Sequence, residues 1–281
     1  MRHTKTLLFA ALAIAASQAH GITIVRNFVS GGNPFPGGAG TAGNAGNTAG
    51  GGTFNALFNA AADYWEAAIL DPHTVTLHYG WQSLSGGTLG VHSLLSEGGT
   101  PHRETAGVIR FDNDAGTAWF SDATPLHHGE FNTFTASTGN FGGGILNTGR
   151  VYTNATGFAS GRYDLFSVML HEIGHSLGLS SANDAFIAGN GDLDIDVTSP
   201  RPFAGSQIPT VSGAHLNVST AAMWPSVSQS VRKLLSATDI LANAQISQFE
   251  NINLNPVPEP ATLIALSLGA LAVLRRKKKV A

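Results

Sequence analysis

The chain has 281 residues, of which only 12% are charged, and its formal net charge is −3 with histidine neutral. This weak negative balance gives no electrostatic basis for binding nucleic acid, so we expect no nucleic acid partner. The chain contains no cysteine, which excludes disulfides, thiolate metal ligands and thiol catalysis.

The N-terminus has the pattern of a secretory signal peptide. Arg2 and Lys5 give a positive start, an apolar run covers residues 7–16, and Ser17 to Ala19 provide small residues for cleavage. The apolar run is too short to span a bilayer. We therefore predict a signal peptide over residues 1–19, export of the chain, and a single mature domain over residues 20–256.

Many of the 34 glycines lie in residues 31–52, a tract of Gly, Ala, Asn and Thr. Such a composition buries little apolar surface and indicates a flexible linker or a surface loop. Beyond it, apolar residues recur at helical spacing over 54–70. The next segments, 74–79, 106–111 and 116–120, have the alternation or the β-branched and aromatic content of strands.

The most informative stretch runs from residue 168 to residue 181. In a helix, the four-residue step between His171 and His175 puts both imidazoles on one face, where they can reach one metal ion. Glu172 lies beside them, and it is well placed to hold a water on that ion. Zinc suits such a site because it accepts nitrogen and oxygen ligands and lowers the pKa of bound water.

The flanking residues support a helix at this place. Apolar side chains recur at helical spacing from Phe166 to Leu177, Asp164 is a suitable N-cap, and Gly178 is a suitable stop. The alternative is a helix that carries two incidental histidines.

His171, Glu172, His175 and Gly178 match the pattern HExxHxxGxx, which a His or Asp follows in the metzincin clan of zinc metallopeptidases. The chain therefore resembles that clan. Ser181 stands where the clan has its third zinc ligand, and a neutral hydroxyl is a poor ligand for zinc. The third ligand comes from elsewhere, or the site is degenerate.

Two downstream residues are candidates for the third ligand. Asp184 follows three residues after Ser181, although an Asp in such a stretch is often a turn or cap residue. His215, which we favour, precedes Met223 and a proline, and this resembles the leishmanolysin-like branch, where an insertion delays the third His before a Met-turn. That resemblance places Met223 beneath the zinc; its other reading is a core methionine. A site with no third protein ligand is the remaining alternative.

The resemblance implies an α+β, zincin-like single catalytic domain with a twisted mixed sheet, a backing helix and an active-site helix. It implies a zinc-dependent endopeptidase that acts on peptides or proteins, with Glu172 as general base. It also implies that substrate adds to a sheet edge, which we expect near residues 106–125. The competing hypothesis is an inactive zincin-fold protein of the surface or extracellular matrix. Ser181 favours it, and the retained Glu172 opposes it.

Three carboxylates, Asp192, Asp194 and Asp196, alternate in a glycine-containing stretch that could bind calcium. The glutamate of an EF-hand loop is missing, so an acidic solvated loop is the preferred interpretation. Further on, a start signal at Ser236 and apolar periodicity predict a last helix that reaches Phe249.

The C-terminus contains Pro258, Glu259 and Pro260, then an apolar run over 261–274 and a basic cluster over 275–279. This resembles the PEP-CTERM sorting signal. The resemblance implies a Gram-negative bacterium, processing by an exosortase, and delivery to the cell surface or extracellular matrix. We expect residues 257–281 to act as a transient membrane anchor through a transmembrane helix, with a plain tail anchor as the alternative.

Overall fold

The computed structural model describes residues 21–114, 116–189 and 191–256. The expected signal peptide and the expected anchoring helix at 257–281 lie outside these residues, and no helix within them is long and apolar enough to cross a membrane.

The strands are β1 (Ile22–Phe28), β2 (Asn47–Ala49), β3 (His73–Gln82), β4 (Gly90–Gly98), β5 (Arg103–Asp112), β6 (Ala118–Phe120), β7 (Phe131–Asn140), β8 (Ile145–Ala155), β9 (Tyr163–Asp164), β10 (Asp194–Asp196), β11 (Gln207–Val211), β12 (His215–Leu216) and β13 (Arg232–Leu234). The helices are α1 (Phe54–Glu66), α2 (Leu165–Ser176), α3 (Asp184–Gly189) and α4 (Ala237–Ile246), with short 3₁₀ turns at Pro36–Gly38 and Gly157–Ala159.

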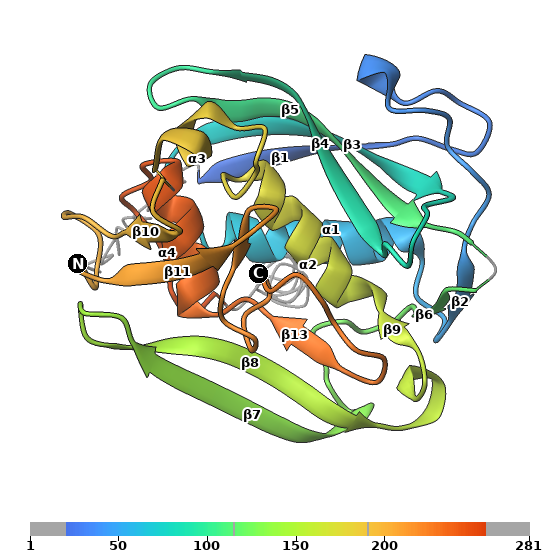
Figure 1. Ribbon diagram of the computed structural model, residues 1–281. Coiled ribbons are helices and arrows are strands. Elements are labelled where there is room, and N and C mark those ends of the chain that lie inside the picture. Colours follow the sequence, from blue (N-terminus) through green and yellow to red (C-terminus); the bar gives the residue numbers. More distant parts are fainter. Residues whose placement is uncertain (1–20, 115, 190, 257–281) are drawn as a thin grey trace, which may run out of the picture.

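A four-stranded mixed sheet forms the upper part of the molecule (Figure 1). Its order is β1-β3-β5-β4; β1, β3 and β5 are parallel, and β4 runs antiparallel to β5. Helices α1 and α2 lie on the same face of this sheet (Figure 1). Apolar residues from both helices and from β3 and β5 form one buried cluster between the layers. This arrangement confirms the predicted α+β class with a twisted mixed sheet.

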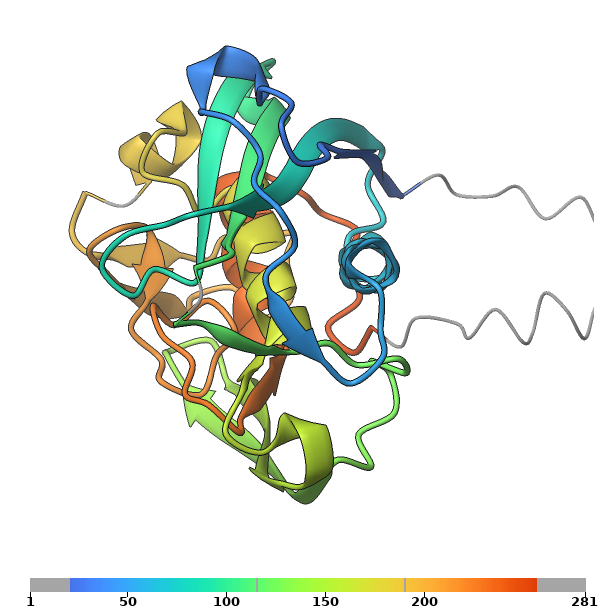
Figure 2. The same cartoon turned by 90° about the vertical axis from the view of Figure 1, so that its right-hand side faces the viewer.

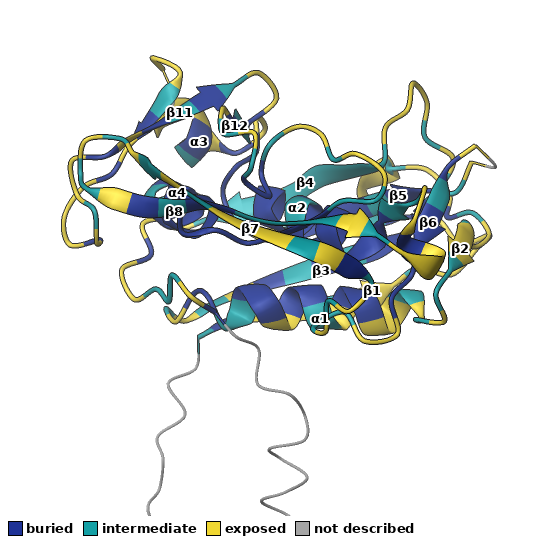
Figure 3. Ribbon diagram, turned by 90° about the horizontal axis from the view of Figure 1, so that it is seen from below, coloured by how far each residue is buried: buried dark blue, intermediate teal, exposed yellow. Residues whose placement is uncertain are grey.

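Helix α1 begins where the side chain of Thr53 accepts a hydrogen bond from the backbone N–H of Ala56, which satisfies a donor that the first turn leaves free. Its buried face contains Leu57 and Trp65, while its other face is exposed (Figure 3). The indole N–H of Trp65 donates to the carbonyl oxygen of Leu170 over 2.9 Å. Helix α1 is therefore tied directly to the middle of α2.

The glycine-rich tract at residues 31–52, expected to be a flexible linker or a surface loop, is a surface segment that packs against the sheet. Phe35 and Ala42 are buried beside Val108 of β5, and β2 pairs with β6. A Cβ atom at Gly52 would lie 2.1 Å from the carbonyl oxygen of Asp122, so only glycine permits this close approach of two backbones.

A second part of the fold lies on the other side of α2. There β13, β8 and β7 form a three-stranded sheet, and α4 packs against β8. Figure 2 shows α2 between the upper sheet and this lower part. A smaller buried cluster, which includes Leu179, Leu216, Met223 and Leu241, fills the space between α4 and the segments around β12.

The expected substrate-binding edge near residues 106–125 is wrong. Strand β5 is flanked by β3 on one side and β4 on the other, so it has no free edge. The edge strands of this sheet are β1 and β4, and the sequence did not reveal β4 because its residues are nearly all half-buried and show no clean alternation. The hydrophobic pattern of one strand also carries no information about its position within a sheet.

Arg232 joins β13 to the start of α2. Its guanidinium is fully buried and lies 2.8 Å from carboxylate oxygens of both Asp122 and Asp164. Asp164 also caps α2 by accepting a hydrogen bond from the backbone N–H of Ser167. The two carboxylates raise the pKa of Arg232 further above its usual value, against the opposing effect of burial. One buried ion network thus fixes the first turn of α2.

Replacing Arg232 with Met should lower the free energy of unfolding by about 3–5 kcal/mol, because it leaves buried carboxylates without a cation. Arg26 is a matched control, since it pairs with Asp63 and Glu66 while 21% of its side chain is exposed. Arg26→Met should cost only about 0–1 kcal/mol. Urea titration of both variants measures the difference, and equal losses would contradict the role given to Arg232.

Candidate metal centre

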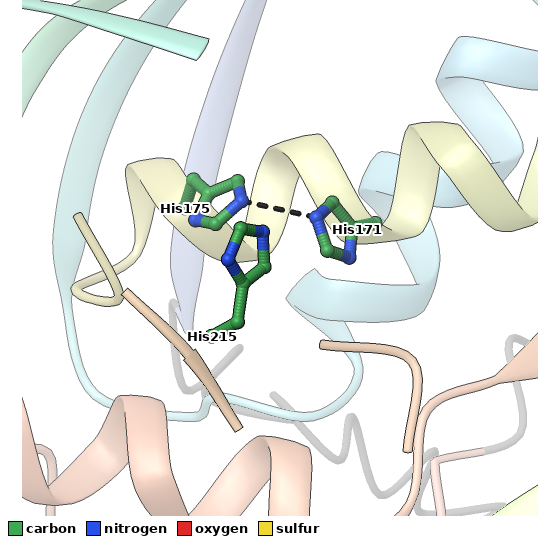
Figure 4. Close-up of side chains that lie close together, drawn as sticks. All are labelled: His171, His175 and His215. Atoms are coloured by element: carbon green, nitrogen blue, oxygen red, sulfur yellow. Dashed lines mark hydrogen bonds between the residues drawn. The ribbon is translucent and has the colours of Figure 1, made fainter. Parts of the chain in front are cut away.

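Three histidines from two parts of the fold point toward one another (Figure 4). His171 and His175 lie one turn apart on α2, and His215 begins β12. One ring nitrogen of each residue lies within 4.8 Å of those of the other two. The Nε2 atoms of His171 and His175 are only 3.0 Å apart.

Each imidazole is oriented by a backbone carbonyl oxygen. Nδ1 of His171 lies 2.8 Å from the oxygen of Ala222, and Nδ1 of His175 faces the oxygen of Leu179. His215 makes the equivalent contact with Ser212 over 3.2 Å. Because a carbonyl oxygen only accepts, Nδ1 of each ring carries the proton and Nε2 keeps its lone pair.

The donor set fits a zinc ion. With both rings protonated at Nδ1, the Nε2 lone pairs of His171 and His175 face each other over 3.0 Å, an arrangement that a cation between them would stabilise. Nitrogens on one tetrahedral zinc, at bond lengths of about 2.0–2.1 Å, lie about 3.3 Å apart. Burial lowers the pKa of all three histidines, so the neutral form that binds metal prevails at neutral pH. Three imidazoles also leave a fourth position open for water.

Met223 lies in the turn directly beneath α2 and is fully buried. A Cβ atom at Gly174 would lie 2.3 Å from its sulfur, so the helix approaches Met223 closely only because residue 174 is glycine. The carbonyl oxygen of Met223 accepts the backbone N–H of Leu216, the residue after His215, over 3.0 Å. The preceding carbonyl, that of Ala222, accepts from His171. The same turn therefore positions ligand candidates on both α2 and β12.

Asp239 supports this turn from below. Its buried carboxylate accepts backbone N–H groups from Ala222 over 3.1 Å and from Met223 over 2.8 Å. It also accepts the backbone N–H and the hydroxyl of Ser236, which completes the capping box at the start of α4. The sequence predicts Ser236 as a helix start but does not predict the second role of Asp239. The capping-box spacing reveals only the local contact.

Glu172 lies between α2 and the edge strand β4. A Cβ atom at Gly90 would lie 2.6 Å from its Oε1 atom, so the first residue of β4 leaves just enough room for the carboxylate. Burial raises the pKa of Glu172 to about 8, while the charge of Arg110 and a hydrogen bond from the backbone of His92 lower it. The carboxyl group is thus buried beside the histidines, and a cation held by them would lower its pKa and favour the carboxylate form that accepts a proton.

A cavity of about 580 Å³ opens over these groups. It is lined by the start of β4 and the loop before it, by α2, by the turn around Ala222, and by Lys233 of β13. Glu172 and the three histidines all contribute to its wall. Ser181, the residue in the expected ligand position, lines the same cavity.

Asp184 does not join the three histidines. Its carboxylate lies 3.0 Å from Nδ1 of His102 and close to Glu97, in a separate, largely exposed group beside a second cavity. The carboxylates of Asp192, Asp194 and Asp196 also approach within 4.8 Å of one another at the surface. Exposed acidic groups of this kind commonly hold no ion, so an acidic solvated loop stays the preferred interpretation and calcium binding the alternative.

Comparisons with known proteins support this picture at the level of family. Residues 76–188 match the family described as Matrixin, a family of metzincins, and residues 256–279 match the PEP-CTERM protein-sorting motif. No curated protein and no solved structure matches the chain. The two family matches confirm the resemblance to a metzincin that carries this sorting signal. The Matrixin match includes His171, Glu172 and His175 and ends before His215.

Loss of a hydrogen bond to a zinc ligand typically weakens metal binding by roughly 10- to 100-fold. If His215 is itself the third ligand, His215→Ala should weaken zinc binding by more than this. Asp184→Ala should leave zinc binding unchanged, because Asp184 lies in the separate group with His102. Competition with a zinc-sensitive chelator measures both affinities. The reverse order of effects would assign the third position to Asp184.

Asp239→Asn should weaken zinc binding by about 10- to 100-fold, because the amide NH₂ turns a donor toward backbone N–H groups that need an acceptor. Asp71 provides the control, since it accepts the backbone N–H groups of Glu250 and Asn251 in an exposed position. Asp71→Asn should leave zinc affinity as it is. Similar zinc affinities for the two variants would show that Asp239 does not support the site.

Proposed function

We propose that this chain, whose residues 76–188 carry the matrixin pattern, is a zinc-dependent endopeptidase of the bacterial cell surface. The matrixin match supports a zinc metallopeptidase kind of function. The observation that carries the finer proposal is the convergence of His171, His175 and His215 beside Glu172 in one cavity. Three neutral imidazoles with an adjacent base are the parts that hydrolysis of a peptide bond by a metal-activated water requires.

In the proposed mechanism, the three histidines would hold zinc through Nε2, while their Nδ1 contacts keep the rings in place. Zinc bound there would supply a Lewis acid for the scissile carbonyl and would lower the pKa of the attacking water towards neutrality. Glu172 accepts the proton of the attacking water and then donates it to the leaving amine nitrogen. Only 4% of Glu172 is exposed, so few competing water molecules reach it except through the cavity.

Strand β4 is the proposed binding edge for the substrate backbone. It is hydrogen-bonded to β5 on one side only, and its first residues, Gly90 to His92, line the cavity that contains Glu172. An extended peptide added to this edge would pass over the histidines and continue in both directions. Such binding suits cleavage within a chain, which is why we propose an endopeptidase.

The sorting motif at residues 256–279 indicates export and surface association in a Gram-negative bacterium. We propose that an exosortase is the processing partner, that residues 257–281 anchor the chain to the membrane only transiently, and that the mature enzyme reaches the surface or the extracellular matrix. Secretion in the presence and absence of an exosortase tests this part separately from catalysis.

Replacing Glu172 with Gln should reduce hydrolysis of a general protein substrate such as casein by at least about 100-fold, because the amide cannot accept the proton. Zinc stoichiometry should stay at that of the parent, since Glu172 is not among the proposed ligands. Metal analysis and peptide release, measured on the same preparation, provide the test.

Persistent proteolysis in Glu172→Gln would refute the mechanism. A parent protein that binds zinc yet cuts nothing would favour the competing hypothesis of an inactive zincin-fold surface protein, for which Ser181 in the ligand position is the supporting observation.

A further inference from the structure

The cavity over the histidines contains a buried positive charge that the proposed mechanism does not use. Lys233 is the only lysine among the described residues, and only 8% of it is exposed. Its backbone N–H donates to the hydroxyl of Ser167, which lies one helical turn before His171 on α2. The lysine therefore lines the cavity close to the metal centre.

The ammonium group of Lys233 lacks a full set of partners. It donates to the carbonyl oxygens of Ser219 over 2.8 Å and Ser226 over 3.1 Å. An ammonium has three N–H donors, so one remains uncommitted within the described part of the chain. In that part, no carboxylate lies within ion-pair distance of Lys233. Burial lowers the pKa of Lys233 to about 8, so the ammonium form still prevails at neutral pH; Asp239 raises this pKa from further away, and its carboxylate is already committed to four donors.

We define the basic recess as the part of the cavity lined by Tyr163, Ser167, Val168, Val227 and Lys233. Because only 8% of Lys233 is exposed, an ionic contact formed there is screened less by water than one at the surface. Glu172 does not neutralise the recess, because its carboxylate lies against Gly90 and β4. A buried cation with an open donor favours an anionic ligand.

We infer that the basic recess binds a carboxylate of the substrate next to the scissile bond, so that Lys233 makes the enzyme prefer acidic substrates. This inference rests on the proposed peptidase function. The incoming carboxylate oxygen accepts the third N–H of Lys233 and supplies the missing counter-charge. Two sources present this chemistry: the side chain of Asp or Glu beside the scissile bond, and the free α-carboxylate at the end of a substrate chain.

The test compares variants of one peptide that the zinc-loaded parent cuts. In the first version Glu lies on each side of the scissile bond, in the second Gln does, and both peptides end in an amide. The third version has Gln at both positions and ends in a free carboxylate one residue further on. Two versions present a carboxylate: the Glu peptide and the Gln peptide with a free C-terminus. We expect kcat/KM for one of these two to exceed that of the amidated Gln peptide by about 10- to 100-fold. The version that gains identifies the source of the carboxylate.

Lys233→Met removes the charge and keeps most of the side-chain volume, so the preference should fall to about 1. Lys233→Arg should retain much of it. Arg162→Met is the matched control, since Arg162 contacts the carbonyl oxygen of Phe158 at the surface and does not line the cavity; it should keep the full preference. Each ratio is measured within one variant, so partial loss of folded protein does not change it. A parent without preference, or a preference that survives in Lys233→Met, overturns the inference.

A binding measurement separates this inference from the proposed function. Fluorescently labelled Glu and Gln peptides are titrated with zinc-loaded Glu172→Gln protein, with and without Lys233→Met, and fluorescence anisotropy gives Kd. If the parent cuts nothing, the peptidase proposal fails, while tighter binding of the acidic peptide that depends on Lys233 still supports the recess. Equal Kd values for the two peptides overturn the recess whatever the parent cuts.

Discussion

Asp239 carries a buried carboxylate whose oxygens receive hydrogen-bond donors from two separate segments, the start of α4 and the turn at Ala222 and Met223. Two carbonyl oxygens of this turn accept hydrogen bonds from Nδ1 of His171 and from the backbone N–H of the residue after His215. An unpaired buried carboxylate is costly, so these donors and the acceptor hold one another in place. The three imidazoles converge because hydrogen bonds to this one turn hold both α2 and β12.

The position of α2 between two layers explains how the remaining groups reach the same cavity. The upper sheet contributes β4, whose Gly90 leaves room for Glu172. The lower part contributes His215, the turn at Met223 and the ammonium of Lys233. The buried pairing of Arg232 with Asp164 fixes the first turn of the helix between them. The proposed general base, the ligand candidates and the proposed substrate preference therefore depend on residues from different layers, which α2 brings to one cavity.

The sequence predicted what depends on local spacing. The helix that carries His171 and His175 followed from a four-residue step and from its capping residues, and α1 and α4 followed from their periodicity. His215 is separated from α2 by a long segment, so only the resemblance to a known branch of metzincins suggested it. Strand β4 was missed, and the substrate edge was misplaced, because strand order depends on contacts between distant segments. The second role of Asp239 and the buried position of Lys233 depend on tertiary packing, which has no local signature.

X-ray absorption at the zinc edge, recorded on the zinc-loaded protein, tests the central claim most directly because it reports the atoms that coordinate the metal. The account predicts one zinc per chain with three imidazole nitrogens and one oxygen at about 2.0–2.2 Å. Two imidazoles with carboxylate oxygens, or a protein that retains no stoichiometric zinc, would contradict it.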